Sequence, residues 1–305
     1  MLVIGFLAAI SLIRHLSKNI TTYPQHITNA ALYALIGGVI GARTFYVIHY
    51  FDKYRDNWLD IFRIWQGGLE LLGGVIAAVT VILIYMLYHK LPIRRYLDIL
   101  AIGLMLALAF GRIGCFLNGC CFGKPTDLPW AVRFPYDSFA YHSQINPNLE
   151  RNRPEPQLKL PEDYFYYTDL GGKKYIKPYE QLTEAQQYEV TKGKYRSLPV
   201  HPTQLYSSVI AAILCLVLYF FWRRSQNSQG KLFAKPGSTF SLMLILYGIM
   251  RFFIEFLRDD NPFEYGWWAI YKGGTISQNI SIYMVILGVV LMVVFEKIKQ
   301  KEAKP

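Results

Sequence analysis

Two stretches of the sequence place arginine beside residues that favour anion binding. In the first, Arg112 lies between Gly111 and Gly114, and Asn118 and Gly123 follow. Glycines allow sharp turns that leave backbone amides facing a phosphate, and a guanidinium is permanently charged and binds phosphate oxygens in pairs. This stretch predicts a site for a phosphate-bearing group with Arg112 as its cation. Small residues that only pack helices in lipid are the alternative.

The second stretch repeats polar residues at helical spacing. Tyr247, Arg251 and Glu255 are four residues apart and share one helix face, which Arg258 continues three residues later. One interpretation is an Arg–Glu pair that neutralises itself and locks two helices together. The other is a catalytic site in which the arginines bind phosphate, while Glu255 is either a general base or an electrostatic support for Arg251. We favour the catalytic site because arginine is in excess.

Three cysteines lie beside the first stretch: Cys115, and the adjacent pair Cys120 and Cys121. Such thiols could be redox-active or bind a soft metal ion, so a thiol-dependent membrane protein is an alternative function. Adjacent cysteines rarely both bind one ion, and no histidine has a useful spacing. We therefore expect no metal and no cofactor, and we expect these cysteines not to carry the chemistry. Cys215 should serve packing.

Membrane spans must position these residues. Of 305 residues, 53% are hydrophobic and 17% are charged, against about 25% charged in a soluble chain. Apolar runs of about 20 residues, enough to cross a bilayer, predict six full spans at 27–50, 67–88, 97–117, 202–222, 238–257 and 276–295. The apolar stretch from Met1 to Ile13 is too short to cross. Because Arg14 and Lys18 follow it, we expect a truncated seventh span and not a signal peptide.

Positive residues in the short loops predict the orientation, because cytoplasmic loops carry the excess of lysine and arginine. They concentrate in one alternating set of loops, at Arg14, Lys18, Lys90, Arg94, Arg95, Arg223, Arg224, Lys231, Lys235, Lys297, Lys299, Lys301 and Lys304. The N-terminus is then outside and the C-terminus cytoplasmic. The sequence predicts an all-α polytopic membrane protein with seven helices, the first truncated, and a small α+β extracytoplasmic head. Its parts are spans one to four in 1–122, the head in 123–200, spans five to seven in 201–296 and a basic cytoplasmic tail in 297–305.

Within the head, residues 130–134 alternate as a short strand does. Thr183 and Gln186 have the spacing of a capping box at the start of a helix. These two signals are the basis for expecting both helix and strand in this segment.

The polar candidates of the predicted spans fall in their outer half, where ionisable residues are functional candidates. They are Arg43, Glu70, Arg112, Asn118, His201, Gln204, Tyr206, Tyr247, Arg251, Glu255 and Arg258. Excess arginine at headgroup depth, in a chain of net charge +11, indicates an anionic phospholipid and not nucleic acid. For Arg43 and Arg258, snorkelling toward the interface is an equal alternative.

Several motifs together resemble the prolipoprotein diacylglyceryl transferases of bacterial membranes. They are GRIGCFLNGCCFG at 111–123, PTDLPWAVRFP at 125–135, HPTQLY at 201–206, YGIMRFFIEFLR at 247–258, Gly41-Ala42-Arg43 and Trp65-Gln66-Gly67-Gly68-Leu69. The resemblance covers nearly the whole chain apart from about 137–195. It implies a seven-span enzyme of the bacterial cytoplasmic (inner) membrane that moves diacylglyceryl from phosphatidylglycerol to the lipobox cysteine of a preprolipoprotein and releases glycerol phosphate. An inactive lipid-binding relative is a further alternative.

The resemblance also implies roles for individual residues. It implies the catalytic set Arg112, Tyr247, Arg251, Glu255, Asn118 and Gly123, with Arg112 in contact with the phospholipid. The excess of arginine at headgroup depth adds Arg43, Arg251 and Arg258 as expected phospholipid contacts. Further candidates are Glu70, His201, Gln204, Cys115 and Cys120. The chain departs from the family pattern where Cys115 replaces the usual Asn, Cys120 an acidic residue, and Leu72 a histidine proposed as the base. These departures leave the base unidentified and do not change the phosphate-binding frame.

Overall fold

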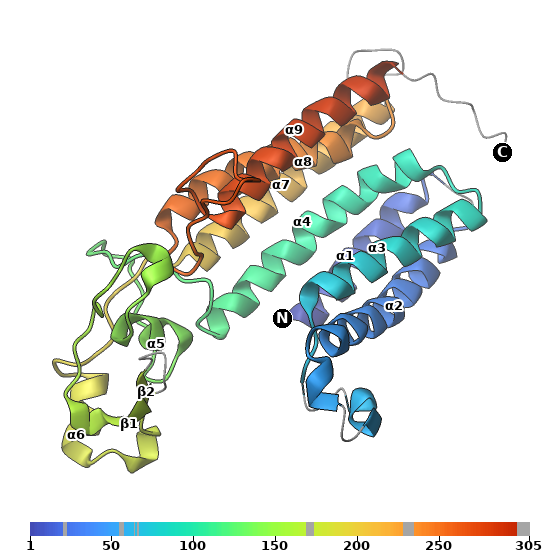
Figure 1. Ribbon diagram of the computed structural model, residues 1–305. Helices are drawn as coiled ribbons and strands as arrows, with labels where there is room; N and C mark the ends of the chain where they lie inside the picture. Colours follow the sequence, from blue (N-terminus) through green and yellow to red (C-terminus); the bar gives the residue numbers. More distant parts are fainter. Residues whose placement is uncertain are drawn as a thin grey trace.

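The structure is a computed structural model that describes residues 1–20, 23–54, 58–63, 65, 67–168, 174–227 and 235–297. It is mostly helical. Its long helices lie side by side, and the segment between α4 and α7 projects beyond one end of them (Figure 1). The long helices are α1 (Leu2–Ser17), α2 (Gln25–His49), α3 (Leu71–Tyr88), α4 (Ile93–Leu117), α7 (Thr203–Gln226), α8 (Ser238–Ile254) and α9 (Ile276–Lys297).

Each apolar stretch predicted as a span forms a helix in the described chain, and five of these helices are long and apolar enough to cross a membrane. The chain is therefore a polytopic membrane protein. The two shorter helices are α1 and α3, with 16 and 18 residues. The helix expected from residue 67 begins only at Leu71, because Gly67 and Gly68 adopt left-handed backbone angles of +88° and +76° that no helix continues.

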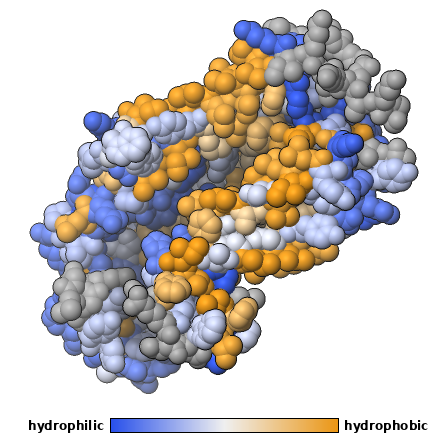
Figure 2. Space-filling view, turned by 45° about the vertical axis from the view of Figure 1, so that its right-hand side comes forward, coloured by the Kyte–Doolittle hydropathy of each residue, from blue (hydrophilic) through white to orange (hydrophobic). Residues whose placement is uncertain are grey.

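Helix α4 is central to the packing. It contacts α1 on one side and α7 and α8 on the other, while α2 packs mainly on α3 and α8 on α9. Ile99 and Ile102 of α4 are fully buried in a core that includes Leu218 of α7 and Met243 of α8. Two apolar masses face each other across a hollow, and hydrophilic residues gather at one end of it (Figure 2). Because α4 joins both masses, residues at its end are placed where they meet.

The segment 123–200 contains both helix and strand. Its helices are α5 (Phe139–Ile145) and α6 (Glu184–Thr191), and strands β1 (Phe165–Thr168) and β2 (Lys174–Ile176) form an antiparallel pair. The capping box of Thr183 and Gln186 is confirmed at the start of α6. Of the strand expected at 130–134, one bridge is present, between Val132 and Val200. The other residues of that stretch form no strand pairing.

The basic tail expected at 297–305 lies outside the described residues apart from Lys297, and so do Lys231 and Gln66. Of the other sequence motifs, Gly41, Ala42 and Arg43 lie in α2.

A buried aspartate links α4 to the start of α8. Asp98 is 3% exposed, and its carboxylate accepts hydrogen bonds from the backbone amides of Gly237 (2.7 Å) and Phe240 (2.9 Å). It caps α8 from a neighbouring helix. Sequence reasoning placed the polar residues of the spans in the outer half and missed Asp98, since its partners are about 140 residues away along the chain. Helix α8 is thereby anchored at its start, opposite the end that leads to Arg258.

We expect Asp98→Ala to lower the free energy of unfolding by roughly 2–4 kcal/mol, because two buried amides lose their acceptor. Chemical denaturation in detergent micelles measures this. Asp127 is exposed, so Asp127→Ala is a matched control that should stay within about 0.5 kcal/mol of the unsubstituted protein. Equal stability of the two variants would contradict the capping role.

Candidate active site

The glycine-rich stretch ends in a loop, residues 118–124, which we call the signature loop. It lies between the start of α7 and the end of α8, and backbone hydrogen bonds hold it there. The Gly123 amide donates to the carbonyl of His201 (3.0 Å), the Lys124 amide donates to that of Leu257 (2.8 Å), and the His201 amide donates to Lys124 (3.1 Å). The loop is therefore fixed mainly through its backbone.

Side chains of the HPTQLY motif complete this attachment. The Thr203 hydroxyl donates to the carbonyl of Cys121 (2.8 Å), and the Gln204 amide donates to that of Cys120 (2.7 Å). The Gln204 Oε1 and His201 Nδ1 atoms are buried and have no hydrogen-bond partner in the described chain. Burial lowers the pKa of His201, so its ring is neutral at pH 7. Gln204 and His201 therefore both contact the signature loop. Each keeps one buried polar atom without a hydrogen-bond partner in the described chain.

Gly123 sits where three segments of chain meet. A Cβ atom added there would lie 2.5 Å from the His201 Cβ, 2.7 Å from the His201 carbonyl oxygen and 2.8 Å from the Leu257 carbonyl oxygen. Backbone atoms cannot move aside as a flexible side chain does, so only glycine fits. The candidate role of Gly123 has a structural basis in this close approach.

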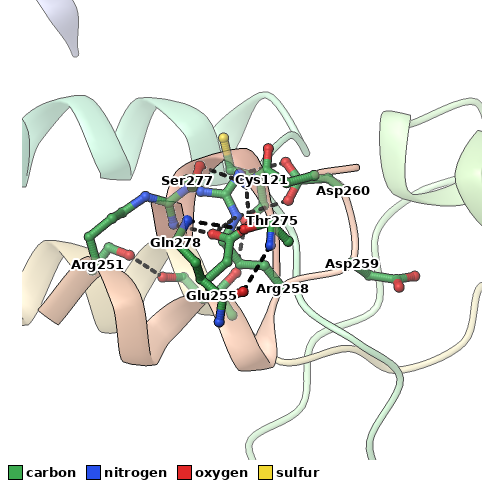
Figure 3. A network of polar contacts seen from close by, with 12 residues as sticks. Cys121, Arg251, Glu255, Arg258, Asp259, Asp260, Thr275, Ser277 and Gln278 are labelled. Atoms are coloured by element: carbon green, nitrogen blue, oxygen red, sulfur yellow. Dashed lines mark hydrogen bonds and ion pairs between the residues drawn. The ribbon is translucent and has the colours of Figure 1, made fainter. Parts of the chain in front are cut away.

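Glu255 is the centre of a buried polar network (Figure 3). Glu255 is 2% exposed. Its Oε2 lies 2.6 Å from Arg251 Nη1, and its Oε1 accepts a hydrogen bond from Asn261 (2.5 Å). Arg251 also donates to the hydroxyl of Ser277 in α9 (2.7 Å), and Arg258 Nε lies 3.8 Å from the carboxylate. The shared helix face allowed the Arg251–Glu255 ion pair, which is the interpretation that the sequence analysis did not favour. Asn261 and Ser277 lie on the following loop and helix, and the spacing did not predict them.

Arg258 is neutralised by a second carboxylate. Its Nε and Nη2 donate to the two oxygens of Asp260 at 2.8 and 2.6 Å. Burial alone would lower the pKa of Arg258, and the pair with Asp260 raises it above its ordinary value. Arg151 of the segment 123–200 donates to the Arg258 carbonyl (2.6 Å), and Arg153 pairs with Asp259 (2.6 Å). This segment therefore holds the loop that follows α8, a contact that the sequence analysis did not predict.

Arg112 is the cation of this region that no acidic group pairs with in the described chain. Its Nε is buried without a hydrogen-bond partner, and it lies within electrostatic range of Arg251. Arg251 and Arg258 are paired with the carboxylates of Glu255 and Asp260, and Arg112 adds one positive charge that no carboxylate of the described chain offsets. At Gly111, next to Arg112, a Cβ atom would find nothing within 4 Å, so that side of α4 is open. The arrangement suits a singly charged anion such as a phosphodiester.

The remaining candidates lie apart from this network. Arg43 donates four hydrogen bonds, at 2.7–2.9 Å, to the carbonyls of Asp60, Ile61, Gly67 and Gly68, so it holds the loop before α3 against α2. Glu70 precedes α3 as its N-cap residue and pairs with His49 at 3.4 Å. Leu72 is 61% exposed in the first turn of α3. The structure brings neither Arg43 nor Glu70 into contact with Arg112 or Arg251 among the described residues.

Two catalytic candidates near Arg112 and Arg251 make no side-chain hydrogen bond among the described residues. Tyr247 lies one turn before Arg251 on α8 and interacts with it electrostatically. Asn118 ends α4 as an exposed residue, and its side chain makes no hydrogen bond in the described chain. Both side chains are therefore available to a ligand.

The three cysteines of this region come together. The sulfur atoms of Cys115, Cys120 and Cys121 all lie within 4.8 Å of one another, and all three residues are half-buried. Cys215 is buried within α7, as expected of a packing residue. Although adjacent cysteines rarely bind one ion together, this loop geometry brings the thiols of Cys120 and Cys121 close to that of Cys115.

The fold and site define a helical, polytopic membrane protein with a surplus cation among buried ion pairs at the end of its helices. The family described as Prolipoprotein diacylglyceryl transferase matches residues 1–294, and the chain belongs to this family. The chain is 28% identical over 289 residues to phosphatidylglycerol–prolipoprotein diacylglyceryl transferase of Clostridium tetani, covering 95% of this chain and 88% of the relative. It is 31% identical to that of Buchnera aphidicola (96% and 89% covered) and 29% identical to that of Burkholderia lata (96% and 88%).

We expect Gly123→Ala to destabilise the signature loop, because its new methyl group meets backbone on two sides. The midpoint of thermal unfolding in detergent and the transfer rate should both fall. Gly111→Ala is the matched control: its methyl group enters open space, and alanine favours the helix by about 1 kcal/mol. Its thermal midpoint should not fall. A Gly123→Ala protein as stable as Gly111→Ala would show that the close approach is not required.

The variant Glu255→Gln distinguishes between two roles of Glu255, electrostatic support of the arginines and general base. If Glu255 holds the arginines in place, the neutral variant leaves buried guanidinium groups unpaired and loses stability, by roughly 3–5 kcal/mol for a broken buried pair. We expect this loss together with the loss of transfer. Normal denaturation with absent transfer would assign the carboxylate to proton transfer instead.

Proposed function

We propose that this chain transfers the diacylglyceryl unit of phosphatidylglycerol to the lipobox cysteine of prolipoproteins. The thiol sulfur forms a thioether with the glycerol carbon, the bond from that carbon to the phosphate oxygen breaks, and glycerol phosphate leaves. The observation that carries the assignment to this site is the unpaired Arg112 beside the neutralised Arg251 and Arg258. Family membership supports the transferase over a thiol-dependent protein or an inactive relative.

Arg112 serves the phosphate in this proposal. The phosphodiester carries one negative charge and the leaving glycerol phosphate gains more, so a fixed cation is most valuable as the bond breaks. The ion pairs of Glu255 and Asp260 hold Arg251 and Arg258 before the lipid arrives. No reorganisation of these groups is then needed during the reaction. Asn118 and Tyr247 supply neutral hydrogen bonds to the same lipid.

We assign Glu255 to positioning and not to proton transfer. One of its oxygens forms an ion pair with Arg251, without hydrogen-bond geometry, and the other accepts a hydrogen bond from Asn261. Among the candidate carboxylates, Glu70 keeps more access to solvent, with an exposed His49 as its partner. Since Leu72 stands at the position of the family's usual histidine, Glu70 is our candidate for the group that accepts the thiol proton.

We infer the membrane placement from the loop charges. The seven helices α1, α2, α3, α4, α7, α8 and α9 are the spans, with the N-terminus outside, the C-terminus in the cytoplasm and the segment 123–200 above the outer face of a bacterial inner membrane. The arginine site then lies at the level of the outer headgroups, where phosphatidylglycerol and the lipobox meet. Labelling of single cysteines in 123–200 by an impermeant reagent from the outer side tests this, and labelling only from the cytoplasmic side would reverse it.

We expect Arg112→Ala to lower lipid binding and the transfer rate together. Loss of one buried charge-assisted contact is worth about 2–4 kcal/mol, a factor of roughly 30 to 1,000 in rate. Arg112→Lys keeps the charge and loses the planar fork, so it should retain some binding with a much lower rate. Transfer of labelled glycerol from phosphatidylglycerol to a lipobox peptide by the purified protein measures these rates.

Arg224→Ala provides the control, because Arg224 is exposed near the opposite end of α7. It should transfer at the rate of the unsubstituted protein. If Arg112 only snorkels to the interface, both of its variants will also be nearly normal. A correctly inserted Arg112→Ala protein with an unchanged rate would refute the proposed site.

A further inference from the structure

The cluster of three thiols has a geometry that depends on the signature loop. Neighbouring side chains normally point apart in strands and helices. Here Gly119 and Cys121 both adopt left-handed backbone angles, +70° and +59°. The loop folds back over the end of α4, and the Cys120 thiol donates to the Cys115 carbonyl at a sulfur–oxygen distance of 3.7 Å. The turn therefore directs both adjacent thiols toward Cys115.

We propose that Cys115, Cys120 and Cys121 form a binding site for a thiophilic monovalent cation, Cu(I), and that its binding inhibits lipid transfer. Their sulfurs lie within 4.8 Å of one another, and the cluster in the described chain consists of sulfur donors without carboxylate or imidazole. Soft thiolate ligands select Cu(I), whereas Ca²⁺ and Mg²⁺ require oxygen and a structural zinc site takes four ligands. The inhibitory part rests on the proposed transferase function.

The charges around the cluster explain why a bound ion would inhibit. Cys115 interacts electrostatically with Arg112, and Cys121 with Arg258. Metal binding deprotonates thiols and releases the protons to water. Three thiolates with one Cu(I) carry two negative charges in place of a neutral cluster. This charge offsets the surplus on Arg112 that the phosphodiester needs, so the lipid binds less well.

The loop contacts give a second route to the same result. The backbone carbonyls of Cys120 and Cys121 are the acceptors for Gln204 and Thr203. A metal that draws the sulfurs together would pull on the segment that these bonds hold in place. Oxidation of two of the thiols to a disulfide would also strain the loop, but it requires an oxidant and leaves no bound metal.

The experiment uses the full-length protein in detergent, reduced and free of metal, with Cu(I) added anaerobically in competition with a chromogenic chelator. We expect one Cu(I) per chain, protection of Cys115, Cys120 and Cys121 from alkylation, and a loss of transfer that parallels occupancy. In Cys121→Ser, metal-free transfer should remain, Cu(I) affinity should fall by at least roughly 100-fold, and added Cu(I) should no longer inhibit. Cys215→Ser should bind Cu(I) and be inhibited as the unsubstituted protein is.

Three results would overturn the inference. They are equal Cu(I) affinity in the unsubstituted protein and Cys121→Ser, full transfer by the Cu(I)-loaded protein, and a disulfide in place of bound metal by thiol titration. The alkylation pattern needs no variant, so it decides the matter even if Cys121→Ser does not fold. Absence of transfer by the metal-free protein would contradict the proposed function alone, because Cu(I) stoichiometry tests the site independently.

Discussion

The arrangement of the candidate site depends on one desolvated carboxylate. Glu255 has almost no contact with solvent, and a buried charge is tolerated only where partners replace its hydration. Arg251 and Asn261 supply those partners, which ties the end of α8 to the loop behind it, while Ser277 of α9 binds the same arginine. The neighbouring helix end and loop must therefore keep their relative positions for the carboxylate to stay paired.

The signature loop is attached to this frame mainly by its backbone. Gly123 and Lys124 bond to carbonyls of the α7 entry and the α8 end, and Thr203 and Gln204 donate to carbonyls of the loop. None of these contacts depends on which side chains stand at 115 and 120. A change of side chain at position 115 or 120 would therefore leave these attachments of the signature loop in place.

The arginines of the candidate site differ in how their positive charge is balanced. Among the described residues, carboxylates neutralise Arg251 and Arg258 but not Arg112, so the charge of Arg112 is left for a ligand. Arg43 differs from Arg112, because its guanidinium group donates hydrogen bonds to backbone carbonyls of a loop. Family membership identifies the class of reaction, while these contacts support the proposal that Arg112 takes part in it.

The sequence by itself determined the helices and the Arg251–Glu255 pair. Lipid requires continuous apolar runs, and residues four apart share a helix face, so both are properties of near neighbours in the chain. Only the tertiary structure decided that Asp98 caps α8, that Arg43 serves a loop, and that Cys115 meets Cys120 and Cys121. Those outcomes depend on left-handed turns and on contacts across tens to more than a hundred residues, which no local pattern encodes.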